Sequence, residues 1–233
     1  MITLAEMLLV FAFLALFSLI SHYKKLLDLD GILIGNAVGI ATITWGPHAV
    51  VDLFAVIMFF LVAELASNIS KKKHGQRGIS NVLSNSLPAL VMLLLIMVFP
   101  TRSALMELAF FGGIAAAFAD TMSSEVGRFS KKEPVLITTL KPTRKGIDGG
   151  ITLLGESAGF FSALSIAIIF FYVRPNFLLA FVIILAGLVG TNVDSWFGAM
   201  FERKGLLNNS HVNLLGSGAG ALFALIIGAL LSA

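Results

Sequence analysis

Carboxylates and hydroxyls occur together at the end of one apolar stretch. Residues 119–128 read ADTMSSEVGR. On a helix, Asp120 and Ser124 share one face, with Gly127 close to it, whereas Glu125 falls on another face. A carboxylate beside hydroxyls is a suitable ligand set for a hard cation. The alternative is that these side chains only solvate a helix end.

A basic, glycine-rich stretch follows. Residues 134–139 read PVLITT and residues 141–150 read KPTRKGIDGG. Glycine lets a backbone approach a phosphate closely, and a helix beginning near residue 148 would offer free N–H groups to an anion. We therefore expect a polyphosphate-binding loop, although it is not a Walker A motif. The alternative is a loop that only anchors the protein at a membrane surface. The candidate residues are Thr138, Lys141, Thr143, Arg144, Lys145, Gly146, Gly149 and Gly150.

Residues 191–199, TNVDSWFGA, again place an Asp before a hydroxyl. The apolar stretches that follow also match, because LLGESAG at 153–159 parallels LLGSGAG at 214–220. We interpret the C-terminal half as two parallel copies of one helix–loop–helix unit. This repeat would bring Asp120 and Asp194 to the same depth, where both could hold one Mg²⁺. For the glycines themselves, close helix packing is the simpler interpretation.

Amide side chains suggest a place for a lipid phosphate. Arg77, Asn81 and Asn85 are four residues apart and therefore project from one face of a helix. An arginine with two amides can bind a phosphate, and Asn192 is a further candidate. The alternative is an interface anchor with hydrogen bonds between helices. The four histidines are scattered over loops and receive no role.

The elements that carry these residues are apolar and of membrane-spanning length. Of 233 residues, 58% are hydrophobic and 12% charged, whereas a soluble domain has about 25% charged residues. These values exclude a soluble domain and a nucleic-acid-binding module, and the absence of Cys excludes thiolate sites. We expect an all-α polytopic membrane bundle of eight spans, or seven if the second and third form one broken unit. The expected spans are 2–20, 30–46, 49–69, 80–99, 104–125, 148–172, 177–200 and 213–232.

The charges indicate the orientation. Of 16 Lys and Arg residues, 14 lie in the odd-numbered loops, and only Arg102 and Arg174 lie in the others. By the positive-inside rule, the odd-numbered loops are cytoplasmic and both termini are outside. Ten of the 13 acidic residues fall on the same side, so we expect an active site at the cytoplasmic face of the cell membrane. The chain is expected to be one domain, 1–103 with four spans and 104–233 with four catalytic spans and the cytoplasmic loop 126–147.

The pattern A-D-T-x-x-S-E-x-G, followed by P-x-L-I-T and a basic turn ending in G-G, resembles a known membrane family. This is the integral-membrane family that contains plant phytyl-phosphate kinase and transmembrane protein 19. Residues 77–85 and 194–199 are also similar, and the likeness spans 28–220. A looser similarity links Asp120, Gly127, Lys141, Lys145 and Gly146 to the CTP-binding region of dolichol and phytol kinases. Two departures are a short loop at 71–76 and Met122, where an aromatic residue is common.

The resemblance implies CTP-dependent phosphorylation of an isoprenyl monophosphate, giving the diphosphate and CDP. It implies that Asp120, Ser124 and Glu125 form the nucleotide–metal site, beside Thr138, Lys145, Gly149 and Gly150. We expect Asp120 and Asp194 to hold Mg²⁺, with Lys145 as the third catalytic residue. The expected partners are the nucleotide, an isoprenoid lipid phosphate and membrane lipids, without nucleic acid.

Other functions remain open at this point. They are a prenyl alcohol kinase, a CDP-lipid cytidylyltransferase, and a lipid or anion transporter that uses intramembrane carboxylates. A phosphate acceptor is already ionised, whereas an alcohol needs a general base, so the absence of an intramembrane His mildly favours the phosphate. Asp194 or Glu156 could nevertheless serve as that base. The sequence also leaves open the prenyl chain length, the choice of CTP or ATP, and whether the protein is a homodimer.

Overall fold

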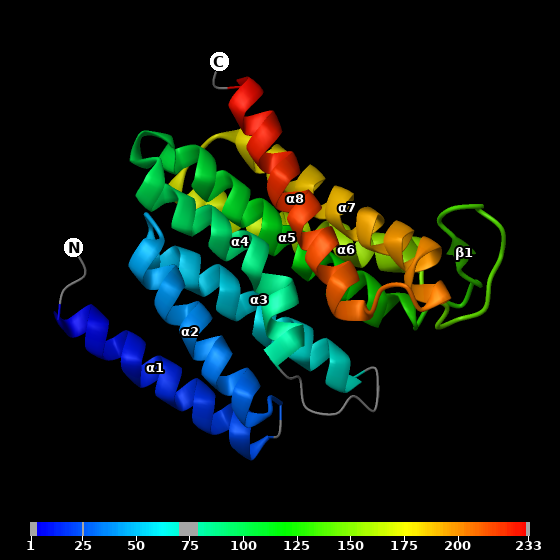
Figure 1. Ribbon diagram of the computed structural model, residues 1–233, viewed down its shortest axis with the longest axis horizontal. Helices are drawn as coiled ribbons and strands as arrows, with labels where there is room; N and C mark the ends of the chain where they lie inside the picture. Colours follow the sequence, from blue (N-terminus) through cyan, green and yellow to red (C-terminus); the bar gives the residue numbers. More distant parts are fainter. Residues whose placement is uncertain (1–3, 25, 70–78, 232–233) are drawn as a thin grey trace.

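A computed structural model describes residues 4–24, 26–69 and 79–231, and eight α-helices lie in these ranges. The helices are α1 (Leu4–Tyr23), α2 (Leu29–Trp45), α3 (Ala49–Ile69), α4 (Ile79–Val98), α5 (Ser103–Gly127), α6 (Leu153–Val173), α7 (Phe177–Met200) and α8 (Asn209–Leu231) (Figure 1). Two short 3-10 helices, η1 (Pro100–Arg102) and η2 (Glu202–Lys204), precede α5 and follow α7. Two short strands, β1 (Val135–Leu136) and β2 (Gly150–Ile151), lie between α5 and α6.

Six of the helices, α3 to α8, are long and apolar enough to cross a membrane. The apolar stretches of α1 and α2 are shorter and cover Val10–Tyr23 and Leu29–Trp45. The predicted all-α membrane bundle of eight helices is therefore confirmed.

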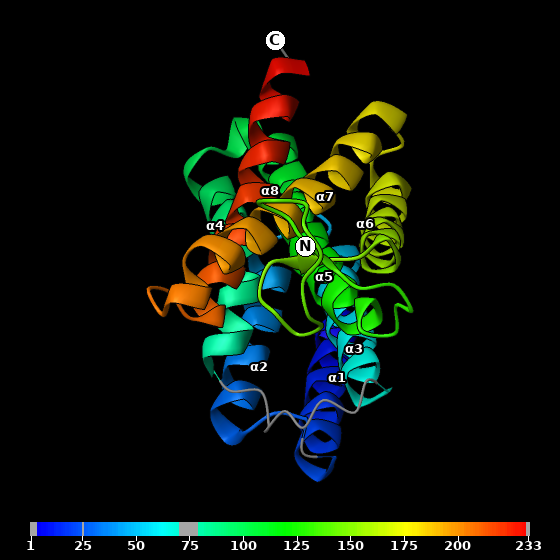
Figure 2. The same ribbon diagram turned by 90° about the vertical axis from the view of Figure 1, so that its right-hand side faces the viewer.

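Helix α5 lies at the centre of the bundle. It packs against α3, α4, α6, α7 and α8 (Figure 2). Its residues from Met106 to Ala119 are buried. Small residues permit this close packing, as Gly112 faces Ala224 of α8 and Gly190 of α7 faces Ala116. The side chains at the end of α5 are therefore held by neighbouring helices.

Alternate loops gather at opposite ends of the bundle. His48 before α3 and Arg174 after α6 both contact Glu107 near the start of α5, so the second, fourth and sixth loops share one end. The loop from α5 to α6 shares a cavity at the other end with Asn209, where α8 begins. The start of α1 and the end of α8 lie away from the β1 loop (Figure 1). This alternation agrees with the prediction that odd-numbered and even-numbered loops lie on opposite sides of the bundle.

The start of α6 differs from the prediction. We expected a helix from residue 148, but α6 begins at Leu153. Thr152 caps this helix start, because its hydroxyl accepts a hydrogen bond from the Gly155 N–H (3.0 Å). Gly149 has φ 77°, which a helix cannot contain, and Gly150 belongs to β2, which pairs antiparallel with β1. The expectation that Gly149 and Gly150 form a helix start is therefore wrong.

Candidate functional site

A polar cavity of about 190 Å³ lies at the end of the bundle where α5 meets α6 and α7. The end of α5, the start of α6, the end of α7 and the loop between α5 and α6 form its walls. The polar side chains that line it include Asp120, Ser123, Ser124, Arg128, Lys145, Asp148, Thr152, Glu156, Asp194, Ser195, Glu202 and Asn209.

Two carboxylates meet inside this cavity. Asp120 of α5 and Asp194 of α7 lie within hydrogen-bonding distance of each other. The Thr191 hydroxyl, one turn before Asp194, donates to Asp120 Oδ1 (3.4 Å). Asn213 of α8, in the amide orientation that satisfies its neighbours, donates to Asp194 Oδ2 (3.2 Å). Side chains from α7 and α8 thus hold the pair that the repeat predicted.

Small residues explain why these carboxylates are so close. Gly190 of α7 packs against Ala116 of α5 and the backbone of Gly216 of α8. A side chain at Gly216 would place its Cβ 2.9 Å from the Cβ of Asp194. The glycines of the repeat therefore have the packing role that we considered the simpler interpretation.

A third carboxylate, Glu156 in the first turn of α6, also lines the cavity; the sequence suggested it only as a possible general base for an alcohol acceptor. Its Oε2 accepts a hydrogen bond from Asn192 Nδ2 of α7 (3.3 Å), and Asn192 also donates to the Leu188 carbonyl (2.8 Å). We predicted that Asn192 binds a lipid phosphate, but here it orients Glu156. The acidic first turn after Thr152 was the available sequence signal.

The loop between α5 and α6 brings one predicted cation into the cavity. Lys145 lines the cavity and donates from Nζ to the Ser130 carbonyl (2.5 Å). Gly149 docks the loop on α7, since an added Cβ would lie 2.5 Å from the Ser195 carbonyl oxygen. The backbone of residues 146–150 therefore forms one wall, and Ser124, Gly146, Gly149 and Gly150 lie at the cavity as predicted.

Other predicted nucleotide ligands lie elsewhere. The cavity wall does not include Thr138, Lys141, Thr143 or Arg144, although they belong to the same loop, and Lys141 and Arg144 are exposed. Glu125 is buried on another face of α5 and accepts a hydrogen bond from Ser67 of α3 (3.2 Å). The predicted separation of Asp120 and Glu125 is confirmed, and Glu125 is outside the cavity.

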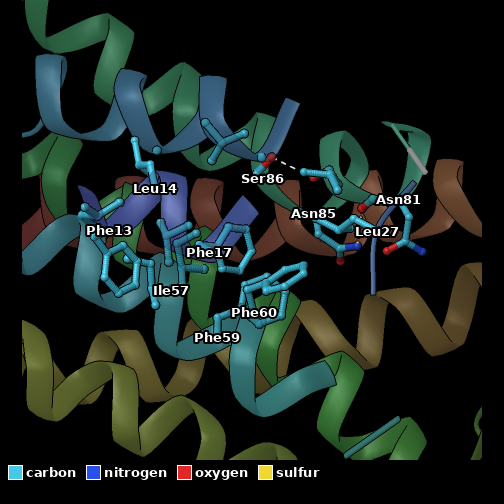
Figure 3. A pocket seen from close by; sticks show the side chains of 17 residues that line it. Phe13, Leu14, Phe17, Leu27, Ile57, Phe59, Phe60, Asn81, Asn85 and Ser86 are labelled. Carbon is cyan, nitrogen blue, oxygen red and sulfur yellow. Dashed lines mark hydrogen bonds between the residues drawn. The ribbon is translucent and has the colours of Figure 1, made fainter. Parts of the chain in front are cut away.

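The predicted lipid-phosphate residues do not form one group. Arg77 lies outside the described residues, whereas Asn81 and Asn85 line a second, mainly apolar cavity among α1 to α4 (Figure 3). This second cavity shares no lining residue with the cavity of Asp120 and Asp194. Binding of a lipid phosphate by Asn81 and Asn85 therefore stays a prediction, because helical spacing gives a shared face but not the neighbours of that face.

The charges of the polar cavity are mostly negative. The lining residues of the described chain include five carboxylates, Asp120, Asp148, Glu156, Asp194 and Glu202, but only two cations, Arg128 and Lys145. Within residues 4–24, 26–69 and 79–231, no three His, Asp or Glu side chains are arranged to hold a metal. Carboxylate oxygens suit Mg²⁺, which usually takes one or two carboxylates plus water and phosphate oxygens. The Asp120–Asp194 pair fits that pattern, and an anion would need a cation to enter.

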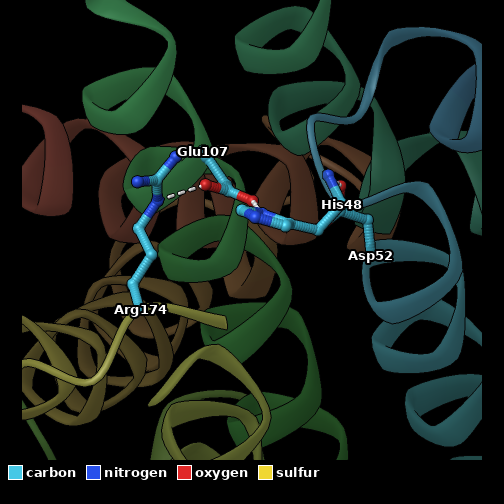
Figure 4. Close-up of polar contacts among 4 residues, drawn as sticks. All are labelled: His48, Asp52, Glu107 and Arg174. Atoms are coloured by element: carbon cyan, nitrogen blue, oxygen red, sulfur yellow. Dashed lines mark hydrogen bonds and ion pairs between the residues drawn. The ribbon is translucent and has the colours of Figure 1, made fainter. Parts of the chain in front are cut away.

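A second polar cluster lies at the opposite end (Figure 4). Buried Glu107 accepts a hydrogen bond from Arg174 Nε (2.5 Å), and its other oxygen lies 2.5 Å from His48 Nδ1. The buried side chain of Asp52 accepts from the His48 backbone N–H (3.1 Å). These contacts tie the loops before α3 and after α6 to α5. Sequence analysis missed this role for His48, and the few polar residues on that side were the available signal.

Comparison with known proteins gives the family context. The model of a family described as "Integral membrane protein DUF92" matches residues 12–221. An uncharacterized membrane protein, MJ0933 of Methanocaldococcus jannaschii, is 36% identical over 182 residues, which cover 75% of each chain. Protein sll0875 of Synechocystis, also an uncharacterized membrane protein, is 31% identical over 218 residues, 87% of this chain and 83% of that one. The chloroplastic protein VTE6 of Arabidopsis thaliana is 26% identical over 208 residues, 81% and 62% of the two chains. No solved structure matches the chain.

Proposed function

The chain belongs to the integral membrane family DUF92, and on this premise we propose that it is a CTP-dependent kinase of isoprenyl monophosphates. In the proposed step, an oxygen of the lipid phosphate forms a bond to the γ-phosphorus of CTP. The bond from that phosphorus to the β–γ bridging oxygen breaks, and CDP leaves with the bonding electrons. The resemblance of residues 119–150 to phytyl-phosphate kinase and the similarity to chloroplastic VTE6 support this reaction class.

The observation that carries the proposal is the Asp120–Asp194 pair in a cavity that Lys145 also lines. Phosphoryl transfer depends on positioning and charge stabilisation more than on covalent chemistry of the protein. When bound by the two carboxylates, Mg²⁺ would supply positive charge to the nucleotide phosphates. The carboxylates of the wall add to this requirement, because those that are ionised repel the phosphates of CTP.

The chain's own cations and backbone would hold the transferring group. Lys145 is fixed by Ser130, and Arg128 lines the same wall, so both can neutralise charge on the phosphoryl oxygens. The first turn of α6 also borders the cavity through Thr152 and Gly155. Free N–H groups at a helix start favour an anion, so α6 supplies this feature from Leu153 instead of from residue 148.

One observation favours a second candidate, a prenyl alcohol kinase. Glu156 lies in the cavity and is oriented by Asn192, as a general base for a hydroxyl group would be. A phosphate acceptor needs no such base. The identity of the acceptor therefore separates the two candidates.

The proposal places the cavity on the cytoplasmic side. The odd-numbered loops carry 14 of the 16 basic residues of the chain, and the loop between α5 and α6, which borders the cavity, is one of them. The positive-inside rule assigns such loops to the cytoplasm, where CTP is present.

The test uses the purified full chain in lipid nanodiscs with Mg²⁺, CTP or ATP, and a panel of prenyl alcohols and prenyl monophosphates. We expect a prenyl diphosphate and CDP, and we expect neither product with the Asp120→Asn variant. A monophosphate formed from the alcohol would select the second candidate. A CDP-lipid with pyrophosphate would contradict both kinases, and nucleotide-independent flux in liposomes would indicate a transporter.

A further inference from the structure

The second cavity has one polar end and one apolar end. Figure 3 shows the amides of Asn81 and Asn85 at one end and Phe13 and Leu14 at the other. Asn81 lies in the first turn of α4, which begins at the same end of the bundle as the polar cavity of Asp120 and Asp194. The cavity therefore runs from amides near the bundle end to aromatic and aliphatic side chains deeper in the apolar region.

The cavity is partly open and measures about 70 Å³. Most of its wall is apolar, and Phe17 of α1 and Phe60 of α3 contribute aromatic rings. Such a wall suits a short section of a hydrocarbon chain.

A line of polar side chains runs along α8 from the acidic pair to α4, whose Asn81 and Asn85 line this cavity. Asn209, Asn213 and Ser217 are four residues apart on α8 and share one face. Asn209 lines the polar cavity, and Asn213 donates to Asp194. Ser217 Oγ donates to the carbonyl of Ser84 (3.1 Å), the neighbour of Asn85 in the chain. The polar side chains of α8 therefore reach from the acidic pair to the backbone of α4, one residue before Asn85.

From this geometry we infer that the cavity among α1 to α4 binds the first section of the acceptor's isoprenoid chain. The phosphate of the acceptor then lies between the Asn81 and Asn85 amides and the Asp120–Asp194 pair. The inference rests on the proposed function, because it assumes that the lipid phosphate receives the phosphoryl group. The small volume predicts selection of the head-proximal isoprene unit and tolerance of the total chain length.

Photolabelling tests this site directly. The full chain in nanodiscs is irradiated with an isoprenyl monophosphate that carries a diazirine on its first isoprene unit, and the labelled peptides are identified by mass spectrometry. We expect label on the α1 segment 13–17 and the α3 segment 57–60, with competition by C10, C15 and C20 isoprenyl monophosphates but not by phosphatidic acid. Label confined to α6 or α7, no specific label, or equal competition by phosphatidic acid would overturn the inference.

A cavity-filling variant supplies the kinetic test. Gly35 of α2 lines the cavity, and an added Cβ would meet only Leu27 Cδ1 at 3.8 Å. Gly35→Leu should raise KM for the isoprenyl phosphate about tenfold, as expected if roughly two methylene groups lose their burial. KM for CTP should not change, and Gly35→Ala should show a smaller effect. Leu33→Phe adds bulk on the exposed side of the same helix and should change neither constant.

The two claims can fail separately. If the wild-type chain transfers no phosphoryl group but is labelled on α1 and α3, the proposed function fails and the lipid site remains. If the wild-type chain is active but is labelled elsewhere and Gly35→Leu leaves both KM values unchanged, the lipid site fails and the kinase assignment remains.

Discussion

Asp120 of α5 and Asp194 of α7 lie within hydrogen-bonding distance, although α6 and two loops separate them in the chain. Both face a cavity whose wall also carries Lys145 and Arg128. Two carboxylates held together by side chains of neighbouring helices in a largely apolar protein must share a proton or bind a cation. This relationship is the basis of the kinase proposal.

Asp120→Asn should lower kcat about 10²-fold or more, as expected for the loss of a preorganised electrostatic group. The variant should also need more Mg²⁺ for half-maximal rate, because an amide is a weaker ligand than a carboxylate. Titration of activity with Mg²⁺ measures both effects. Asp30→Asn, an exposed carboxylate on α2, is the matched control and should behave like the wild type. Wild-type kinetics for Asp120→Asn would refute its role.

Lys145→Ala should raise KM for the nucleotide and lower kcat, because Lys145 lines the polar cavity proposed to bind the nucleotide phosphates. Arg144→Ala should have a much smaller effect, since Arg144 is not part of the cavity wall. Steady-state kinetics with varied CTP compare these neighbours. Equal effects of the two substitutions would mean that only the overall charge of the loop matters.

Gly149→Ala should impair activity more strongly than Gly146→Ala. Both glycines have positive φ, 77° and 84°, so each substitution has a similar backbone cost of about 1 kcal/mol. Only Gly149 packs against α7, where a Cβ would lie 2.8 Å from the Ala199 nitrogen, whereas nothing lies within 4 Å of a Cβ at Gly146. The ratio of kcat/KM for the two variants isolates loop docking. A ratio near one would contradict a docking role.

Arg174→Ala should destabilise the bundle without removing activity at low temperature. It leaves buried Glu107 without its Arg partner, and we expect a cost of about 2–3 kcal/mol because Arg174 is only partly buried. Thermal unfolding in detergent measures the loss, and we expect Tm to fall by roughly 5–10 °C. Arg102→Ala is the control, since Arg102 is exposed in the neighbouring loop at the same end. If both variants had the same Tm, the Glu107 cluster would have no structural role.

Much of the fold could be predicted because composition and charge report directly on a membrane environment. The alternation of basic and nonbasic loops supported eight helices and predicted which loops lie at the same end of the bundle. The repeated Asp-hydroxyl pattern predicted that Asp120 lies beside Asp194. The start of α6 was misplaced because the loop preceding it folds back as β1 and β2, and Gly149 adopts a backbone conformation that a sequence pattern does not specify.

The remaining site residues depended on tertiary neighbours. Asn192 was assigned to a lipid, but the packing of α7 on α6 directs it to Glu156. Asn81 and Asn85 share a helix face as predicted, but α1 to α3 cover that face with apolar side chains. Helical periodicity gives directions around one helix, and the partner helices decide what lies there.

The most direct test of the central claim follows the label of CTP into the lipid. The wild-type chain in nanodiscs is incubated with Mg²⁺, a C20 isoprenyl monophosphate, and CTP labelled at either the α- or the γ-phosphorus. The kinase proposal predicts γ-label in an isoprenyl diphosphate, no α-label in the lipid fraction, and loss of the signal with EDTA or Asp120→Asn. Transfer of α-label to the lipid, or γ-labelled product that persists in EDTA, would contradict it.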